Sequence, residues 1–185
     1  MKTIYIYTDG ACSGNQNEMN IGGWGAILEY GVHTKELYGG EANTTNNRME
    51  MMALLTALKA VKKDGQTISV FSDSSYLMNC FREKWYEGWY RNNWQTSKKT
   101  LVENRDLWEA LLDIIKLHTI SFYRVKGHVN LQSKKIDKAA LYNKFIEWNG
   151  PNFSIEEFCA IIEKNNRADS LANLGVDEVR NKSNI

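Results

Sequence analysis

Near its beginning the chain reads I-Y-I-Y-T-D-G, residues 4–10, a β-prone run that ends at Asp9. A second, buried-type run covers residues 67–72 and ends at Asp73. Between the two, residues 45–61 carry apolar side chains at helical spacing, which predicts a crossover helix. A crossover makes the two strands parallel neighbours, so both aspartates should meet at the carboxyl edge of one sheet, where α/β proteins place their ligands.

Three more strands complete the predicted sheet. Residues 24–30 follow a predicted glycine-rich turn at Gly22-Gly23, and residues 33–38 follow another turn. With the first strand they form an antiparallel meander, whereas the fifth strand, residues 119–126, comes after a mainly helical stretch. The sequence therefore predicts an α/β fold with a five-stranded mixed sheet, three antiparallel strands plus two parallel ones, flanked by helices.

The C-terminal third is predicted to be helical. Residues 136–148 form one helix, which Asn149-Gly150-Pro151 stops, and residues 154–157, S-I-E-E, are a capping box that opens another. The apolar period of that second helix continues to a predicted stop at Gly175. Because no linker or repeat interrupts the pattern, residues 1–185 are expected to form a single domain.

The composition favours a reducing compartment. The three cysteines are odd in number and have no C-x-x-C spacing, so neither a disulfide framework nor a zinc site is expected. No apolar run approaches the roughly 18 residues of a membrane span, and the first residues read as a strand and not as a signal peptide. We expect an unprocessed, monomeric, cytoplasmic protein without membrane contact. Its formal charge of +1 means that any nucleic acid must be bound by a local basic patch.

Four carboxylates occupy positions that a core would avoid. Besides the two aspartates at strand ends, Glu50 lies in register with the apolar stripe of the crossover helix, and Asp169 lies at the border of the last helix's apolar side. A lone buried carboxylate is costly unless it is paired or metal-bound. Taken singly, each acid could be a turn former, a helix cap or a dipole partner. Together they favour a site for a hard divalent cation, Mg²⁺ or Mn²⁺.

Five strings of residues resemble type 1 ribonuclease H of the bacterial kind, and they occur in that family's order. They are Y-T-D-G-A-C-S-G-N at 7–15, T-T-N-N-R-M-E at 44–50, F-S-D-S at 71–74, V-K-G-H at 125–128 and N-x-R-A-D-x-L-A at 165–172. The resemblance implies a ribonuclease H-like fold. It also implies an endoribonuclease that hydrolyses the RNA strand of RNA:DNA hybrids and leaves 5′-phosphate and 3′-hydroxyl products.

The resemblance further implies two-metal-ion catalysis. Two Mg²⁺ ions per active site, for which Mn²⁺ substitutes, would be held by Asp9, Glu50, Asp73 and Asp169. His128 matches a mobile family histidine that assists proton transfer or product release, a role suited to a side chain that titrates near neutrality. Without its flanking residues it would read as a histidine hydrogen-bonded in a loop.

Contacts to the substrate are implied in the same way. Short polar side chains at matching positions would contact both strands and read the 2′-hydroxyl, and Thr45 sits where a pocket for a DNA phosphate is expected. The same residues are also good turn and cap formers, and both roles can hold at once. The predicted contacts are Asn15, Thr45, Asn46, Asn47 and Ser74.

Residues 82–105 resemble the family's handle, a basic protrusion that grips the DNA strand. This segment holds six basic and three acidic side chains, a charge of +3 within a chain of +1. Tryptophans at helical spacing are usually core residues, so Trp85 and Trp89 are expected to pack at the helix junction. The basic side chains are then expected to bind the DNA strand. The substrate contacts predicted in the handle are Trp85, Arg91, Lys98 and Lys99.

One departure from the family pattern is an insertion at about residues 129–164, between His128 and Asp169. Its apolar side chains predict two helices, the second continuous with the helix that carries Asp169. Five basic and five acidic side chains balance in this lobe. We therefore expect it to influence the mobility of His128 and the order of the metal site, and not to be the main hybrid-binding surface.

Two other functions remain open. A hybrid-binding protein without catalysis would keep the handle and the groove, although four intact acids argue against it. A junction-resolving or transposase-like nuclease could use the same fold, because a fold does not fix its substrate. The asparagines and the handle favour cleavage of hybrids.

Overall fold

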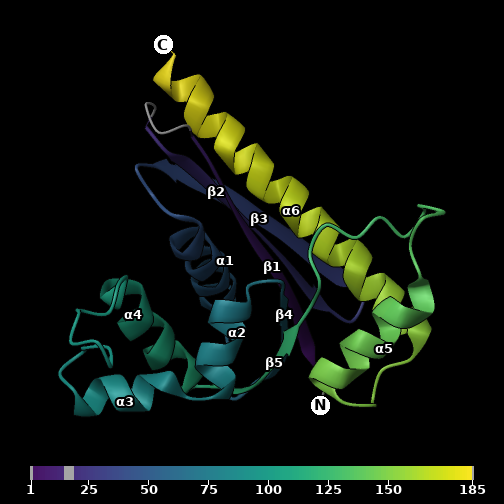
Figure 1. Ribbon diagram of the computed structural model, residues 1–185, viewed down its shortest axis with the longest axis horizontal. Coiled ribbons are helices and arrows are strands. Elements are labelled where there is room, and N and C mark those ends of the chain that lie inside the picture. The colour runs from purple at the N-terminus through teal and green to yellow at the C-terminus, as the bar shows by residue number, and fades with distance from the viewer. Residues whose placement is uncertain (1, 15–18, 185) are drawn as a thin grey trace.

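The computed structural model describes residues 2–14 and 19–184, and a five-stranded sheet lies at its centre (Figure 1). The strand order is β3-β2-β1-β4-β5. The first three strands pair antiparallel, whereas β4 pairs parallel with both β1 and β5. The predicted mixed sheet is thus confirmed. The strands are β1 Ile4–Ser13, β2 Ile21–Tyr30, β3 His33–Ala42, β4 Thr67–Ser72 and β5 Thr119–Arg124.

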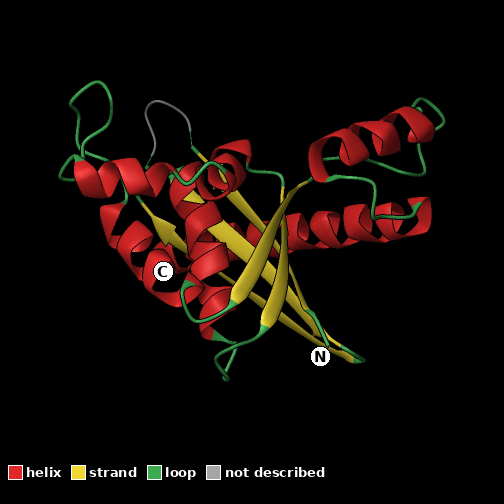
Figure 2. Ribbon diagram, turned by 90° about the horizontal axis from the view of Figure 1, so that it is seen from below, coloured by secondary structure: helices red, strands yellow, loops and turns green. Residues whose placement is uncertain are grey.

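Helices cover both faces of the sheet (Figure 2). Alternate residues of a strand point to opposite faces, so Ile6 and Val70 join one buried cluster while Tyr7 and Phe71 join another. Side chains of α1, α2 and α4 complete the first cluster, and those of α5 and α6 complete the second. The helices are α1 Asn46–Lys59, α2 Ser75–Arg82, α3 Trp85–Arg91, α4 Arg105–Ile115, α5 Lys138–Asn149 and α6 Ile155–Ser183.

The first strand is longer than predicted, and Asp9 does not end it. The parallel ladder between β1 and β4 stops at the pair Thr8↔Ser72. The antiparallel ladder with β2 continues from Asp9 to Ser13. Asp9 therefore lies inside β1 but just past the end of β4, at the point where one side of the strand loses its neighbour.

Two glycines that were predicted to lie at the ends of elements lie inside them. Gly23 lies inside β2 and Gly175 lies inside α6, which continues to Ser183. A Cβ on Gly23 would collide with the carbonyl oxygen of Ala172, and one on Gly175 would collide with that of Gly39. These glycines let the backbone of α6 lie directly on the sheet, a contact between segments far apart in the sequence.

The stretch from Val129 to Lys164 folds as a loop, α5 and the start of α6. The capping box is present: the Ser154 backbone N–H donates to Glu157 Oε2 at 2.7 Å, and the Glu157 N–H donates to Ser154 Oγ at 3.1 Å. From there α6 runs unbroken for 29 residues through Asp169, as predicted. Among the described residues, no helix is both long enough and apolar enough to cross a bilayer.

The end of α5 is tied to the last strand of the sheet by one side chain. Asn149 Oδ1 accepts from the Arg124 backbone N–H at 2.9 Å, and Asn149 Nδ2 donates to the Arg124 carbonyl at 2.8 Å. The Arg124 guanidinium also lies 4.1 Å from the centre of the Trp148 ring. A polar amide and a cation–π contact thus hold the lobe on β5.

Candidate active site

Three predicted acids from three elements meet at one point. Asp9 comes from β1, Asp73 directly follows β4, and Glu50 lies on α1. One carboxylate oxygen from each lies within 4.8 Å of the others. The parallel pairing of β1 with β4 brings the two aspartates together, and α1 crosses above them. Close contact at the loop is possible because residue 127 is glycine, since a Cβ there would collide with the Asp73 carboxylate.

These acids are poorly solvated. Asp9 is 3% exposed and Glu50 is 4% exposed, and Glu50 Oε2 has no hydrogen-bond partner. Burial, and then the charges of Glu50 and Asp73, raise the pKa of Asp9 well above its ordinary value of 3.8. Burial and the charge of Asp73 likewise raise the pKa of Glu50 above 4.5. Clustered, buried oxygen ligands with an orphaned lone pair fit a hard divalent cation.

Asp169 and His128 lie beside this cluster. Asp169 projects from α6 into the same pocket, outside the group of three, and its Oδ2 lies 3.9 Å from His128 Nδ1. The His128 side chain is 77% exposed, and its backbone is left-handed with φ 57°. The structure thus places the predicted histidine at the mouth of the pocket. We call this pocket, about 560 Å³ in volume and lined by all five predicted catalytic residues, the acid pocket.

The raised pKa values predict how pH affects the metal-free protein. The folded state binds protons on Asp9 and Glu50 more tightly than the unfolded chain does. Their contribution to stability is therefore full below the ordinary pKa values near 4 and is lost as pH rises through the folded pKa values. The melting temperature of the protein in EDTA should therefore decrease as pH rises above about 4, through the pKa of Glu50 at about 8 and towards that of Asp9 at about 11.

We expect Mg²⁺ to reverse this loss of stability at higher pH. At about 100 times its dissociation constant it would stabilise the fold by about 2.7 kcal/mol, and more at pH 8 than at pH 5, because protons compete for the same oxygens. Arg48 lowers the pKa of Asp106, so Asp106 loses its contribution to stability only in more acidic solution. The pH range in which Asp106 acts is therefore separate from that of Asp9 and Glu50. A melting temperature at pH 8 that does not respond to Mg²⁺ would contradict the assignment of this site.

The predicted polar contacts divide into two groups. Asn46, Asn47 and Ser74 line the acid pocket, and Ser74 also caps α2 through its Oγ, which accepts from the Leu77 N–H at 3.2 Å. Thr45 lies outside the pocket lining and caps α1, accepting from the Arg48 N–H at 3.2 Å. Asn15 lies outside the described residues.

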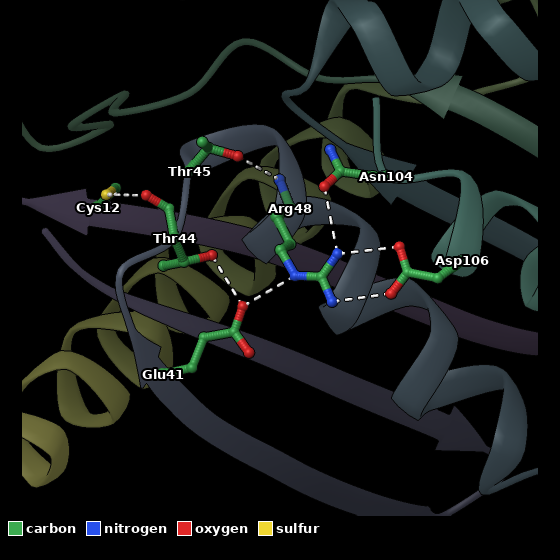
Figure 3. Close-up of polar contacts among 7 residues, drawn as sticks. All are labelled: Cys12, Glu41, Thr44, Thr45, Arg48, Asn104 and Asp106. Atoms are coloured by element: carbon green, nitrogen blue, oxygen red, sulfur yellow. Dashed lines mark hydrogen bonds and ion pairs between the residues drawn. The ribbon is translucent and has the colours of Figure 1, made fainter. Parts of the chain in front are cut away.

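Arg48 joins three elements at this end of α1 (Figure 3). Its Nε donates to Glu41 at 3.0 Å, and its Nη atoms donate to both Asp106 oxygens, at 3.1 and 2.9 Å. Nη1 also donates to the Asn104 side chain at 3.2 Å. The network fixes the start of α4 against α1. Sequence reasoning missed it, because two of its partners lie more than 50 positions further along the chain.

Comparison with known sequences identifies the family. The family profile described as RNase H matches residues 1–143. The chain belongs to the RNase H family. The matched part of this RNase H contains Asp9, Glu50, Asp73 and His128, but ends before Asp169. The place of Asp169 in the site therefore rests on the geometry described above.

Two curated relatives carry the name Ribonuclease H. That of Syntrophomonas wolfei is 53% identical over 128 residues, which are 69% of this chain and 86% of the relative. That of Symbiobacterium thermophilum is 46% identical over 141 residues, 76% of this chain and 93% of the relative. The chain is accordingly an enzyme, a hydrolase of the ribonuclease H type.

Solved structures support the fold of this RNase H. The crystal structure of LC9-RNase H1, a type 1 RNase H with the type 2 active-site motif, matches with a TM-score of 0.62 at 22% identity, over 90% of this chain and 84% of that one. The solution structure of the PFV RNase H domain matches with a TM-score of 0.62 at 22% identity, over 95% and 94%. At this identity the likeness concerns the fold alone.

Residues 82–105, the segment predicted to be a handle, lie at the opposite end of the molecule from α5 (Figure 1). Trp89 and Trp94 are buried, as the helix junction requires. The expectation that Trp85 is a core residue was wrong: it is 37% exposed, with its ring 5.8 Å from that of Tyr76 and its Nε1 donating to Glu83. It begins α3 and faces outward, because the preceding Lys84 has a left-handed backbone that turns the chain. The contact of Trp85 with the substrate stays a prediction.

The predicted cations of the handle are exposed. Lys98 and Lys99 sit in a tight turn closed by the Lys99 N–H, which donates to the Thr96 carbonyl at 2.9 Å. Arg91 makes one ion pair with Glu87 at 3.9 Å, a long contact between exposed groups that holds it weakly. All three remain able to meet an anionic partner.

Several residues that line the acid pocket were not predicted as site residues, among them Asn173 and Tyr76. Asn173 donates from Nδ2 to the Asp169 carbonyl at 3.1 Å, and Tyr76 comes from α2. The spacing of four between Asp169 and Asn173 on one helix was a readable signal. Tyr76 had no such signal, because it reads as an apolar position of α2.

Proposed function

We propose that this RNase H hydrolyses the RNA strand of RNA:DNA hybrids at the acid pocket. The observation that carries the proposal is the buried group of Asp9, Glu50 and Asp73, with an unpartnered oxygen on Glu50, next to the exposed amides of two asparagines. The acids supply a site for cations, and the amides supply donors and acceptors for a sugar edge. The products would be a 5′-phosphate and a 3′-hydroxyl.

Each side chain has a proposed role in the reaction. Asp9, Glu50, Asp73 and Asp169 would hold two Mg²⁺ ions, or Mn²⁺ in their place. When bound, such ions supply positive charge that offsets the developing charge on the phosphate and lowers the pKa of water. Exposed and 3.9 Å from Asp169, His128 would exchange a proton with the leaving oxygen or assist product release.

Recognition of the hybrid would divide between the two strands. Asn46, Asn47 and Ser74 line the pocket where the RNA would be cut and would read its 2′-hydroxyls. Asn15 is proposed to do the same from the β1–β2 connection. Thr45 would meet a DNA phosphate, and the handle would bind the DNA strand further along.

A cleavage assay on a gel distinguishes this function from a different nuclease activity and from hybrid binding without catalysis. RNA:DNA hybrid, double-stranded DNA and double-stranded RNA, each labelled on one strand, should be incubated with the enzyme in Mg²⁺. Cleavage only of the RNA in the hybrid is expected. Cleavage of DNA junctions or duplex DNA would instead show a different nuclease on this fold, and tight hybrid binding without cleavage would show a binding protein.

The handle should control affinity more than turnover. Changing Arg91, Lys98 and Lys99 together to alanine should weaken hybrid binding and lower the salt dependence by up to about three counterions, because each phosphate contact releases roughly one. Saturated turnover should change little.

The test is to measure the dissociation constant of the hybrid in EDTA between 50 and 200 mM salt. Affinities for nucleic acid can change by ~10³-fold over this range, so a difference in slope is measurable. A matched control is Lys35, Lys62 and Lys63 to alanine, since these lysines line a cavity at the amino ends of β1 and β4, away from the acids. An equal salt slope for handle variant and wild type would show that the handle does not touch phosphate.

The cellular compartment and the oligomeric state of this protein stay predictions. All three cysteines are free, which suits a reducing cytoplasm. We propose a monomer that meets the hybrid as its partner.

A further inference from the structure

A second groove opens beside the acid pocket. The loop after β5 forms one wall, with Asn130 and Gln132, and α6 forms the other, with Asn166 and Ser170. The groove has a volume of about 380 Å³. His128 and Asp169 line both this groove and the acid pocket, so the two are continuous. A strand that continued from the acid pocket past His128 would enter this groove.

The loop wall is held in place. Asn166 Nδ2 donates to the Val129 carbonyl at 2.8 Å, and Val129 is buried among the side chains of α5 and α6. Asn130 Oδ1 accepts from the Gln132 N–H at 3.0 Å, which shapes the turn. Leu131 packs against the same buried cluster. A strand that binds here therefore meets a preformed surface and pays little to order it.

The groups in this groove suit a ribose edge. The exposed side chains of Asn130, Gln132 and Ser170 offer donors and acceptors, and Glu163, also in the lining, offers a carboxylate. A 2′-hydroxyl both donates and accepts, so it can pair with amides and with the carboxylate, whereas a deoxyribose leaves them unpaired. A carboxylate in the lining disfavours direct phosphate contact at that spot.

Two lysines follow the groove residues along the same loop. Lys134 and Lys135 are exposed on the same loop, and neither forms an ion pair within residues 2–14 and 19–184. The balanced charge of residues 129–164 hides this arrangement, because Glu147, Glu156 and Glu157 lie on α5 and α6. The loop itself has one acid, Asp137 at the N-cap of α5, beside the two lysines, and so keeps a net positive charge. The loop therefore presents local positive charge to a polyanion.

We propose that this groove binds the RNA strand on one side of the cut, with the amides on the 2′-hydroxyls and the two lysines on the phosphates. The inference rests on the proposed function and extends it. It makes the lobe a second grip, at the opposite end of the molecule from the handle (Figure 1). The enzyme would read RNA over a longer stretch than the acid pocket alone covers.

The test uses one groove variant and modified hybrids. All four side chains, Asn130, Gln132, Lys134 and Lys135, are exposed. Changing them to alanine should therefore lower the melting temperature only slightly, through loss of the Asn130 hydrogen bond in the turn. In EDTA the variant should bind a long hybrid about tenfold more weakly, and its salt slope should fall by roughly two counterions. The matched control, Lys62→Ala with Lys63→Ala, removes equal charge at the far end of β4 and should behave as wild type.

The decisive comparison concerns the 2′-hydroxyls. Hybrids whose RNA carries deoxyribose on one side of the cut, or on the other, should be compared with the full RNA strand. On one side only, the replacement should weaken wild-type binding about three- to tenfold, the value of one or two hydrogen bonds, and should leave the groove variant unaffected. If wild type and groove variant respond alike on both sides, the proposal is overturned.

Failure of this inference is distinct from failure of the proposed function. Wild-type enzyme that cuts no hybrid would overturn the function. Wild-type enzyme that cuts hybrids, with a groove variant of equal affinity and salt slope, would overturn the second grip alone. If the fourfold variant melts early, Lys134→Ala with Lys135→Ala keeps the test, because a lower salt slope is still expected and an unchanged one still refutes the grip.

Discussion

An Asp73→Asn enzyme should bind hybrids and fail to cut them. The amide is isosteric but uncharged, so it cannot complete a carboxylate site for divalent cations. Charge stabilisation of several kcal/mol would be lost, which corresponds to a fall in turnover of roughly a thousandfold or more. Single-turnover cleavage in Mg²⁺, beside a hybrid-binding titration, measures both effects.

The same substitution should stabilise the metal-free protein. Asp73 repels Glu50 in the folded state, and this repulsion helps to raise the pKa of Glu50. Removing one charge should raise the melting temperature in EDTA and abolish the further rise on adding Mg²⁺. Asp113→Asn is the matched control, since Asp113 is an exposed carboxylate on α4 that should change neither activity nor Mg²⁺ response. Wild-type turnover in the Asp73→Asn enzyme would refute the role of this acid.

Replacing Val129–Lys164 with a short glycine-containing loop should unfold much of the protein. The segment contributes Phe145 and Phe158, each 2% exposed, to the cluster that covers one face of the sheet. Their loss would uncover Phe71, which is 1% exposed. Removing one buried phenylalanine side chain costs about 3–5 kcal/mol, and whole domains have only about 5–15 kcal/mol. Turnover should fall with the fold.

A milder variant makes the prediction quantitative. Phe158→Ala should lower the free energy of unfolding by about 3–5 kcal/mol in urea titrations. Ile155→Ala, three residues earlier in α6 and 36% exposed, is the control and should cost less than about 1 kcal/mol. An unchanged melting temperature after deletion of the whole segment would show that the lobe packs only on itself.

The sheet could be predicted because its signals are local. Each buried strand is a continuous β-prone run, and the helix between β1 and β4 dictates their parallel pairing. The ends of strands and helices could not be predicted equally well. In the sequence Gly23 and Gly175 are typical of a turn and of a helix end. In the structure each lies where two backbones are in contact, and this depends on how distant segments pack.

The site shows the same division. Asp9, Glu50 and Asp73 could be found because an anion on an apolar stripe or at a strand end is anomalous in itself. That His128 approaches Asp169 depends on the loop between β5 and α5, which no periodicity describes. The Arg48 network is likewise invisible, because its acids come from β3 and α4.

The amide of Asn149 has one more consequence, for how copies of this protein behave when crowded. β5 is an outer strand, and such strands offer unpaired N–H and C=O groups that can recruit a strand from a neighbouring molecule and start aggregation. At Arg124 both groups are already occupied by the Asn149 side chain, which stands in for the missing neighbour. An incoming strand could not extend its ladder past this position, so the last residue of α5 closes the carboxyl end of that border of the sheet.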